Sequence, residues 1–473
     1  MALDRRGLIA ALAATGADVV ATEDARLVYE HDGSTLHGAR PAAVAFPTST
    51  AQVAGLVGAC VAAGVPFVAR GAGTGLSGGA MALDGGVVLA CNRMDRILAL
   101  DPLRRRATLQ PGVANLAVSR AAAAFGLHYA PDPSSQAVCT VGGNVAHNSG
   151  GPHTLKHGVT VNHVLGLELV LPDGEVARVG GPERAGYDLL ALLCGSEGTL
   201  GIVTEITVRL LPRPQAARTL LAAFPSPAEA GQAVTALIAG GALPSALEMM
   251  DAVVVQALEA AFAFRFPAGA GALLLIECDG PAADVDEQAA LVQGACRAAG
   301  ALSVRVAADE AERAEIWKAR KRAFGALGRL ARNYCTQDGV IPRTRLPEML
   351  ARVADVAARH RLRVANVFHA GDGNLHPCIL FDDRDDDESA RVSLAGREIL
   401  QACLELGGSL SGEHGIGVEK REAMRQQFSE PSLAAMLRLR EAFDPRGLCN
   451  PGKILPTGGA CVEVPPRHRQ AAL

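Results

Sequence analysis

The chain has 473 residues, of which 49% are hydrophobic and 20% are charged, and its formal net charge is −4. This length predicts about two to four globular domains with large cores, and the absence of a basic stripe disfavours nucleic-acid binding. The 11 cysteines include no CxxC pair, which favours reduced thiols in a cytosolic protein over a disulfide framework or an iron–sulfur cluster.

The N-terminal stretch MALDRRGLIAALAATGA predicts an amphipathic helix, because its apolar residues recur at helical spacing. A signal peptide is the less favoured alternative. The longest apolar stretch, from Val53 to Ala69, is too short and too interrupted by glycine and proline to span a bilayer. It predicts a helix over 50–63 with Ser49 as N-cap and Gln52 completing a capping box, a stop at Gly64, and a strand over 65–69.

Short strands and glycine loops continue to about residue 214, with strands predicted over 87–90, 106–109, 164–171, 175–179 and 202–210 and a helix over 115–125. From about 218 to 329, strands and helices alternate as in a ferredoxin-like split βαβ domain, so a second domain is predicted from about residue 215. The acidic run at 382–388 predicts a solvated loop, and the tail after residue 456 has no periodicity.

A glycine-rich loop follows the strand at 65–69. Its residues 73–78 satisfy GxGxxG, but a strand beginning at Val87 leaves no room for the helix of a Rossmann unit. Five glycines between Arg70 and Gly79 favour a cradle of backbone N–H groups for a phosphate, with a merely flexible loop as the alternative. Two further loops of this kind, at 131–151 and 186–208, favour one extended phosphate-bearing cofactor.

The segment HAGDGNLH, from His369 to His376, lies between apolar runs that predict strands. A β-hairpin turn at GDGN would bring the two histidines side by side on neighbouring strands. Two imidazoles and a carboxylate, Glu413 of SGEHGIG, make a three-ligand metal site with open positions. The alternative is an ordinary polar hairpin and a surface loop.

The order of these motifs resembles the FAD-linked oxidases of the vanillyl-alcohol oxidase superfamily, in particular the glycolate oxidase FAD subunit and D-lactate dehydrogenase branch. The matching motifs are PTSTAQV, RGAGTGLSGGA, VGGNVAHNSGG, GSEGTLGIVTEI, HAGDGNLH, SGEHGIG and NPGKIL. The resemblance implies an α+β fold. It has a PCMH-type FAD-binding domain with an N-terminal helix over 1–214, a ferredoxin-like α/β substrate (cap) domain carrying the metal site over 215–425, a helical C-terminal segment over 426–457 that returns to the FAD domain, and a loose tail over 458–473.

The resemblance also implies the site residues. Non-covalent FAD is expected, because the glycine loop lacks the histidine that relatives with covalently attached flavin commonly carry there. A divalent metal, with zinc as the first choice, is expected at His369, His376 and Glu413, with His414 as catalytic base. Arg320 is expected to bind the substrate carboxylate, ahead of Lys321 and Arg329. The implied FAD contacts are Arg70, Gly71, Gly73, Thr74, Gly75, Leu76, Ser77, Gly78, Pro131, Asp132, Ser135, Gly142, Gly143, Asn144, Ser149, Glu197, Gly198, Ile202 and Asn450.

The implied reaction is oxidation of a small 2-hydroxy acid, D-lactate or glycolate, by hydride transfer to flavin, while the metal orients the substrate and His414 takes the hydroxyl proton. Cys378 at the second position after His376 favours a small acid over 2-hydroxyglutarate. The alternatives are D-2-hydroxyglutarate dehydrogenase-like activity, an FAD subunit of a multi-subunit glycolate oxidase and, less favoured, a metal-dependent hydrolase. An iron–sulfur subunit or a quinone is the expected electron acceptor. A homodimer, and peripheral attachment of a cytoplasmic protein to the inner face of the membrane, are left open.

Overall fold

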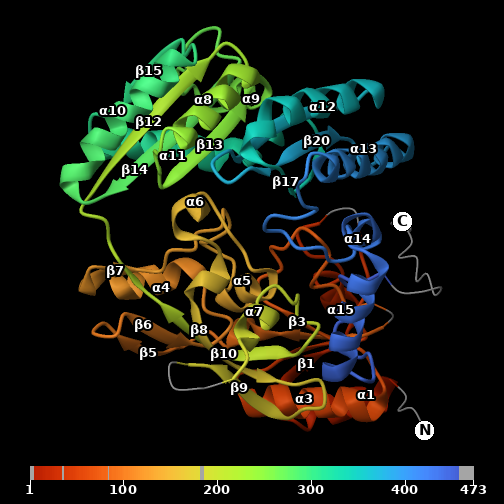
Figure 1. Ribbon diagram of the computed structural model, residues 1–473. Coiled ribbons are helices and arrows are strands. Elements are labelled where there is room, and N and C mark those ends of the chain that lie inside the picture. Colours follow the sequence, from red (N-terminus) through yellow and green to blue (C-terminus); the bar gives the residue numbers. More distant parts are fainter. Residues whose placement is uncertain (1–4, 35–36, 84, 182–185, 457–473) are drawn as a thin grey trace. The chain divides into compact units, whose positions relative to one another are not determined.

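The computed structural model describes residues 5–34, 37–83, 85–181 and 186–456 (Figure 1). The chain divides into two compact units. Unit 1 comprises Met1–Ser149, Val159–Arg213 and Glu413–Leu473, and unit 2 comprises Gly150–Gly158 and Pro214–Gly412. The tail predicted to be loose, over 458–473, lies outside the described residues. The mixed α+β architecture expected from the sequence is confirmed.

The first sheet of unit 1 has four strands in the order β1-β2-β4-β3. Its strands are β1 (Asp18–Val20), β2 (Ala43–Phe46), β3 (Phe67–Arg70) and β4 (Val87–Ala90), and the last three are parallel. Helices α1 (Arg5–Ala13) and α3 (Thr50–Ala63) pack together in the same core. The predicted N-terminal helix is therefore confirmed from residue 5 onward.

Helix α3 begins and ends where its local signals predict. The Ser49 hydroxyl accepts a hydrogen bond from the N–H of Gln52, and Gly64 ends the helix in the left-handed conformation at φ 67°. The capping box is not reciprocal, however, because the Gln52 side chain accepts from the N–H of Thr48 rather than from that of Ser49. The strand after the helix begins at Phe67, two residues later than predicted.

The second sheet of unit 1 is antiparallel, in the order β5-β6-β10-β8-β9. Its strands are β5 (Ile97–Asp101), β6 (Arg106–Leu109), β8 (Val164–Val170), β9 (Val176–Gly180) and β10 (Ile202–Arg209), and its own hydrophobic cluster includes α4 (Asn115–Ala122) and α5 (Val141–His147). The remaining elements of unit 1 are α2 (Glu23–Leu27), α7 (Leu189–Leu193), α14 (Met424–Gln427), α15 (Glu430–Phe443), β7 (Leu127–His128), β11 (Leu211–Pro212) and the 3-10 turns at 91–93, 123–125, 160–163 and 421–423.

Unit 2 is built on a sheet in the order β15-β12-β14-β13-β18-β19-β17, with β20 pairing both β18 and β16. Its strands are β12 (Ala216–Phe224), β13 (Ala246–Asp251), β14 (Ala272–Gly280), β15 (Ser303–Val306), β16 (Asn333–Thr336), β17 (Gly339–Val340), β18 (Arg363–His369), β19 (Asn374–Leu375) and β20 (Pro377–Phe381).

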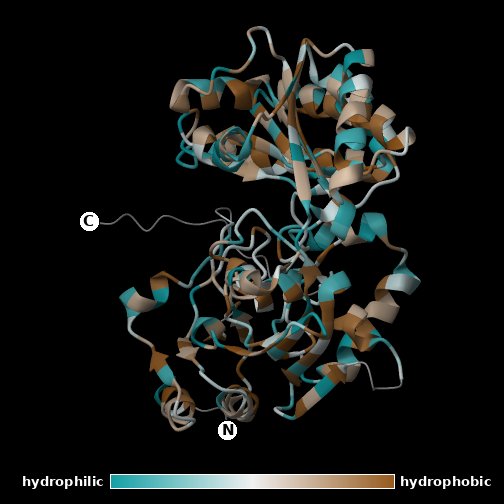
Figure 2. Cartoon of the chain, turned by 90° about the vertical axis from the view of Figure 1, so that its left-hand side faces the viewer, coloured by the Kyte–Doolittle hydropathy of each residue, from teal (hydrophilic) through white to brown (hydrophobic). Residues whose placement is uncertain are grey.

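Helices α9 (Ala252–Phe262) and α11 (Glu310–Leu327) share one hydrophobic cluster with β12, β13, β14 and β18. Helices α8 (Pro227–Ala239), α10 (Ala282–Ala298) and α12 (Leu346–Arg359) form a second group against the sheet, and unit 2 also contains α6 (Thr154–His157), α13 (Asp386–Glu405) and a 3-10 turn at 343–345. Hydrophobic and hydrophilic residues alternate along the elements of both units, as amphipathic packing requires (Figure 2).

The acidic run at 382–388 is only partly a loop, which corrects the sequence prediction. Asp385 caps α13 by accepting from the N–H of Glu388, and the next three acidic residues form the first turn of that helix. Negative charge is favourable there because the N-terminal end of a helix carries partial positive charge. Within the described part of the chain, none of the helices has the length and apolar character needed to cross a membrane.

Candidate active site

All predicted FAD residues lie in unit 1, on three glycine-containing loops and the C-terminal segment. The first of these loops packs too closely against its neighbours for a side chain at Gly79, because a Cβ placed there would lie 2.9 Å from Cε1 of His147. Nδ1 of His147 and Nδ2 of Asn144 are buried and have no hydrogen-bond partner among the described residues. Bare backbone and unsatisfied buried polar atoms fit an extended polar ligand such as FAD.

The loop carrying His414 is held by two of the predicted FAD residues. The Ser77 hydroxyl donates to the His414 carbonyl at 3.0 Å. The two carboxylate oxygens of Glu197 accept from the N–H groups of Ile416 at 2.7 Å and Gly417 at 2.8 Å. The side chains of Ser77 and Glu197 therefore fix the backbone around the candidate base, and direct contact between either side chain and FAD stays a prediction.

Asn450 has a similar internal role. Its Nδ2 donates to the carbonyls of Gly79 at 2.9 Å and Glu197 at 2.8 Å. Its own N–H donates to the carbonyl of Phe67 on β3 at 2.7 Å. The C-terminal segment thus joins the first and third glycine loops, and the structure shows Asn450 as a link between them.

The other predicted FAD residues occupy the same loops. Arg70 is buried at the end of β3 and donates from Nη1 to the carbonyl of His31 at 2.9 Å. Thr140, which the sequence did not single out, caps α5 by accepting from the N–H of Gly143. The residues from Gly71 to Gly78 follow β3, the Pro131, Asp132 and Ser135 group follows β7, Gly142, Gly143, Asn144 and Ser149 belong to or follow α5, and Gly198 and Ile202 lead into β10.

Among the buried charged residues of unit 1 that were not singled out from the sequence, Lys453 and Asp32 lie close to the glycine loops. Lys453 is fully buried and donates from Nζ to the carbonyl of Met81 at 2.9 Å and to Oδ1 of Asn450 at 3.1 Å. Burial lowers the pKa of Lys453 to about 7, against the opposing effect of Glu197. Asp32 lies beside the first glycine loop, where Gly33 donates to the carbonyl of Gly75, and burial raises the pKa of Asp32.

The predicted histidine hairpin is confirmed in unit 2. Strand β18 pairs with β20 and, through His369 and Asn374, with β19. The turn is closed by the Asp372 carboxylate, which accepts from the N–H of Asn374, and by Gly373 at φ 79°. The rings of His369 and His376 lie edge to face with centroids 5.1 Å apart, and one nitrogen of each lies within 4.8 Å of the other.

Both histidines direct Nδ1 toward an acceptor. Nδ1 of His369 lies 2.7 Å from Oε1 of Glu248, and Nδ1 of His376 lies 3.4 Å from the carbonyl of Gln337. Each ring is 3% exposed. Two buried imidazoles oriented through Nδ1 fit a divalent metal, because a ligating histidine usually donates its other ring N–H to such a group.

Arg320 lies on α11 and is 2% exposed. Its Nε donates to Oε2 of Glu248 at 2.7 Å, and its Nη2 lies 2.7 Å from the same oxygen. Burial favours a raised pKa for Glu248, but the charges of His369 and Arg320 outweigh this and lower it. Lys321 and Arg329 are exposed. The expected role of Arg320 toward substrate stays a prediction, and its observed partner is Glu248.

The segment SGEHGIG passes from one unit to the other. Asp338 accepts hydrogen bonds from the Ser411 hydroxyl at 2.6 Å and from the N–H of Gly412 at 3.1 Å in unit 2. Glu413 and His414 belong to unit 1.

Cys378, which the sequence related to substrate size, is fully buried in the cluster beneath α9 and α11, and burial raises its pKa to about 12.

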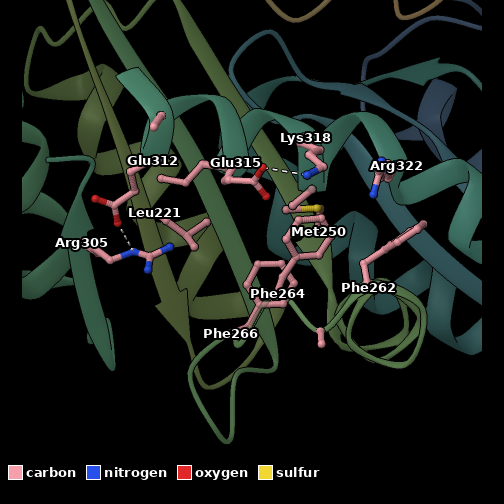
Figure 3. A pocket seen from close by; sticks show the side chains of 14 residues that line it. Leu221, Met250, Phe262, Phe264, Phe266, Arg305, Glu312, Glu315, Lys318 and Arg322 are labelled. Carbon is pink, nitrogen blue, oxygen red and sulfur yellow. Dashed lines mark hydrogen bonds and ion pairs between the residues drawn. The ribbon is translucent and has the colours of Figure 1, made fainter. Parts of the chain in front are cut away.

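A pocket of about 430 Å³ in unit 2 contains none of the predicted site residues. Figure 3 shows Phe262, Phe264 and Phe266 on one side of it and residues of α11 on the other. Its charged rim is largely neutralised, because Arg305 pairs with Glu312 and Lys318 pairs with Glu315. This pocket therefore shares no lining residue with the predicted site.

Two family models match the chain: an FAD binding domain over residues 41–180 and the C-terminal domain of FAD linked oxidases over residues 213–454. The chain belongs to the FAD-linked oxidases and is an FAD-dependent oxidoreductase.

Among its relatives, the glycolate oxidase subunit GlcD of Escherichia coli K12 is 47% identical over 98% of this chain and 94% of the relative. The subunit of the same name from Bacillus subtilis is 41% identical over 91% and 92%. The D-lactate dehydrogenase of Anaerostipes hadrus is 34% identical over 90% and 92%.

Solved structures show the same fold at low identity. The 4-ethylphenol oxidase of Gulosibacter chungangensis matches with a TM-score of 0.78 at 19% identity, over 95% of this chain and 97% of that one. A p-cresol methylhydroxylase matches with a TM-score of 0.76 at 16% identity, over 95% and 96%.

Proposed function

We propose that the protein oxidises a small 2-hydroxy acid, glycolate or D-lactate, to the 2-oxo acid. The observation that carries this proposal is the buried pair of His369 and His376 in a chain whose relatives are named for glycolate and D-lactate. A divalent metal, zinc first, held by His369, His376 and Glu413, would supply Lewis-acid stabilisation of the substrate oxygens. FAD, held non-covalently on the loops of unit 1, would accept the hydride.

The remaining steps belong to side chains of the protein. His414 takes the hydroxyl proton, and the hydrogen bond from Ser77 to its carbonyl supports a fixed position for this base. Nε of Arg320 donates a hydrogen bond to Glu248, whereas Nη2 lies close to the same carboxylate but has no hydrogen-bond partner among the described residues. The remaining N–H groups of the guanidinium serve the substrate carboxylate. Cys378 lies in the core, so the preference for a small acid rests on the relatives.

The electron acceptor is proposed to be a partner subunit with an iron–sulfur cluster, or a quinone. The naming of two relatives as glycolate oxidase subunits supports a partner chain. A cytoplasmic location with peripheral attachment to the inner face of the membrane, and a homodimer, belong to the same proposal.

Anaerobic reduction of the bound flavin tests the proposal directly. The purified yellow protein is mixed with the D and L forms of lactate and 2-hydroxyglutarate and with glycolate, and the flavin absorbance is followed. We expect bleaching with glycolate or D-lactate. His414→Ala should retain FAD and lose the bleaching, because the base is gone while the FAD loops are unchanged. Protein that takes up no FAD, or flavin that no 2-hydroxy acid reduces, would contradict the proposal.

A further inference from the structure

A buried carboxylate connects α11 to the histidine pair. Glu248 on β13 lies directly opposite His369 on β18 in the antiparallel ladder, so the two side chains share one face of the sheet. Oε1 of Glu248 lies 2.7 Å from Nδ1 of His369, and Oε2 accepts from Nε of Arg320 at 2.7 Å. None of the three side chains is more than 3% exposed, so these contacts are shielded from bulk solvent.

The polarity of this chain of hydrogen bonds is fixed by the groups themselves. A guanidinium only donates and an ionised carboxylate only accepts. Oε2 is occupied by the cation, and Oε1 therefore accepts the proton of Nδ1. In the neutral form of the ring, which is the form that can bind a metal, His369 then carries its lone pair on Nε2, the nitrogen that faces away from Glu248.

We propose that Glu248 and Arg320 are positioning residues that hold His369 in the Nδ1–H form and thereby present Nε2 as a metal ligand. This inference rests on the proposed function only in taking the ion that the histidines bind to be a divalent metal. His376 has longer contacts, because its Nδ1 lies 3.4 Å from the backbone carbonyl of Gln337 and 4.0 Å from Oδ1 of Asp338. His369 is accordingly the ligand whose Nδ1 lies within hydrogen-bond distance of a carboxylate, at 2.7 Å from Glu248.

Glu248→Gln is the informative substitution, because an amide has one accepting and one donating end. The Arg320 cation holds the amide oxygen, so the NH₂ group faces His369 and needs an acceptor there. Nδ1 becomes that acceptor and the proton moves to Nε2. The form of the ring is thus expected to invert although the size of residue 248 is unchanged.

Nitrogen-15 histidine spectra of the metal-free, full-length protein measure this inversion without any reference to activity. The wild type should show His369 protonated on Nδ1, and Glu248→Gln should show it protonated on Nε2, with the His369→Gln spectrum assigning the signals. Asp251→Asn is the matched control. Asp251 is a second buried carboxylate of β13 that bonds Asn366 of β18, so its replacement should leave His369 unchanged.

Zinc affinity gives the second readout, by competition between FAD-loaded protein and a chromophoric chelator for Zn²⁺. Glu248→Gln should weaken binding by about 10- to 100-fold, the usual effect of losing the partner of a ligating histidine, and Asp251→Asn should not. Adding Arg320→Met to Glu248→Gln should restore part of the affinity, because the amide oxygen is then released to face His369.

The outcomes separate this inference from the proposed function. A wild-type His369 protonated on Nε2, an unchanged ring in Glu248→Gln, or equal zinc affinity in the wild type and Glu248→Gln would overturn the positioning role. Wild-type protein that binds no Zn²⁺ would overturn the metal assignment, and the metal-free spectra would still decide the inference.

Discussion

Gly417 shows how closely single residues determine the loop that carries the candidate base. It adopts φ 53°, and a Cβ there would lie 2.6 Å from the carbonyl carbon of Ser77. Gly417 also donates its N–H to the Glu197 carboxylate, and the Ser77 hydroxyl donates to the carbonyl of His414 in the same loop. A methyl group would therefore force the loop away from the first glycine loop.

Gly417→Ala should lower the free energy of unfolding and the FAD content of the purified protein. Gly447→Ala is the matched control, because Gly447 has φ 63° and a Cβ placed on it would have no atom within 4 Å. Both variants lose about 1–2 kcal/mol to the left-handed backbone, and only Gly417→Ala adds a clash of about 1–3 kcal/mol. Urea unfolding and the ratio of flavin to protein provide the measurements, and equal losses in the two variants would refute the argument.

At the scale of elements, the segment from Gly150 to Gly158 is pinned to unit 2, although the chain on both of its sides belongs to unit 1. The ring of His153 stacks on that of Trp317 on α11, with centroids 5.5 Å apart and an interplanar angle of 25°. Lys156 donates to the carbonyl of Asp279 at 2.5 Å and pairs with its carboxylate at the end of β14. The short helix α6 is held by these two contacts.

Lys156→Met should loosen this segment without unfolding the unit. The side chains of Lys156 and Asp279 are only 23% and 10% exposed, so breaking the pair leaves a poorly solvated carboxylate. Hydrogen exchange followed by mass spectrometry should show faster deuterium uptake in peptides covering 150–158. Arg104→Met removes the more exposed ion pair with Asp101 and should leave that uptake unchanged. Wild-type uptake in Lys156→Met would argue against the pinning.

At the scale of the whole molecule, the two units differ in the ligands proposed for them and in the signals that report their unfolding. The predicted FAD residues all lie in unit 1. Trp317, the only tryptophan of the chain, lies in the core of unit 2. Each unit has its own hydrophobic clusters. Tryptophan fluorescence therefore follows unfolding of unit 2.

Excess FAD should stabilise unit 1 more than unit 2. A ligand at 100 times its dissociation constant adds about 2.7 kcal/mol to the unit that binds it. In metal-free protein, the unfolding midpoint of flavin release should therefore rise more than the midpoint of Trp317 fluorescence. Equal shifts of both signals would mean that the two units unfold as one cooperative body.

Local sequence signals predicted the elements whose ends are set by local chemistry. Ser49 and Gly64 fixed α3 to the residue, and GDGN fixed the turn that pairs His369 with His376. The acidic run misled because the same residues that keep a loop solvated also stabilise the first turn of a helix.

The residues that support the site were not predictable in the same way. Glu248 and His369 are 121 positions apart, and nothing in or near the segment SALEMMD indicates that the Glu248 carboxylate faces a histidine. Lys453 and Met81 are 372 positions apart. Such pairs form because the strand order and the meeting of distant loops bring the two residues together. In a single sequence, the only sign of such a pair is a charged residue among apolar residues.

Two of the three arginines of α11 also define the position of this helix on the sheet. Arg313 bonds Glu277 on β14, and seven residues later Arg320 bonds Glu248 on the neighbouring strand. A slide of one helical turn, about 5.4 Å, would leave both carboxylates buried beside apolar side chains. A helix face made only of leucines would allow the helix to slide along the sheet. Two buried ion pairs at a fixed spacing allow α11 only one axial position. The ion pairs of Arg313 and Arg320 therefore fix the axial position of Arg320 relative to the two histidines.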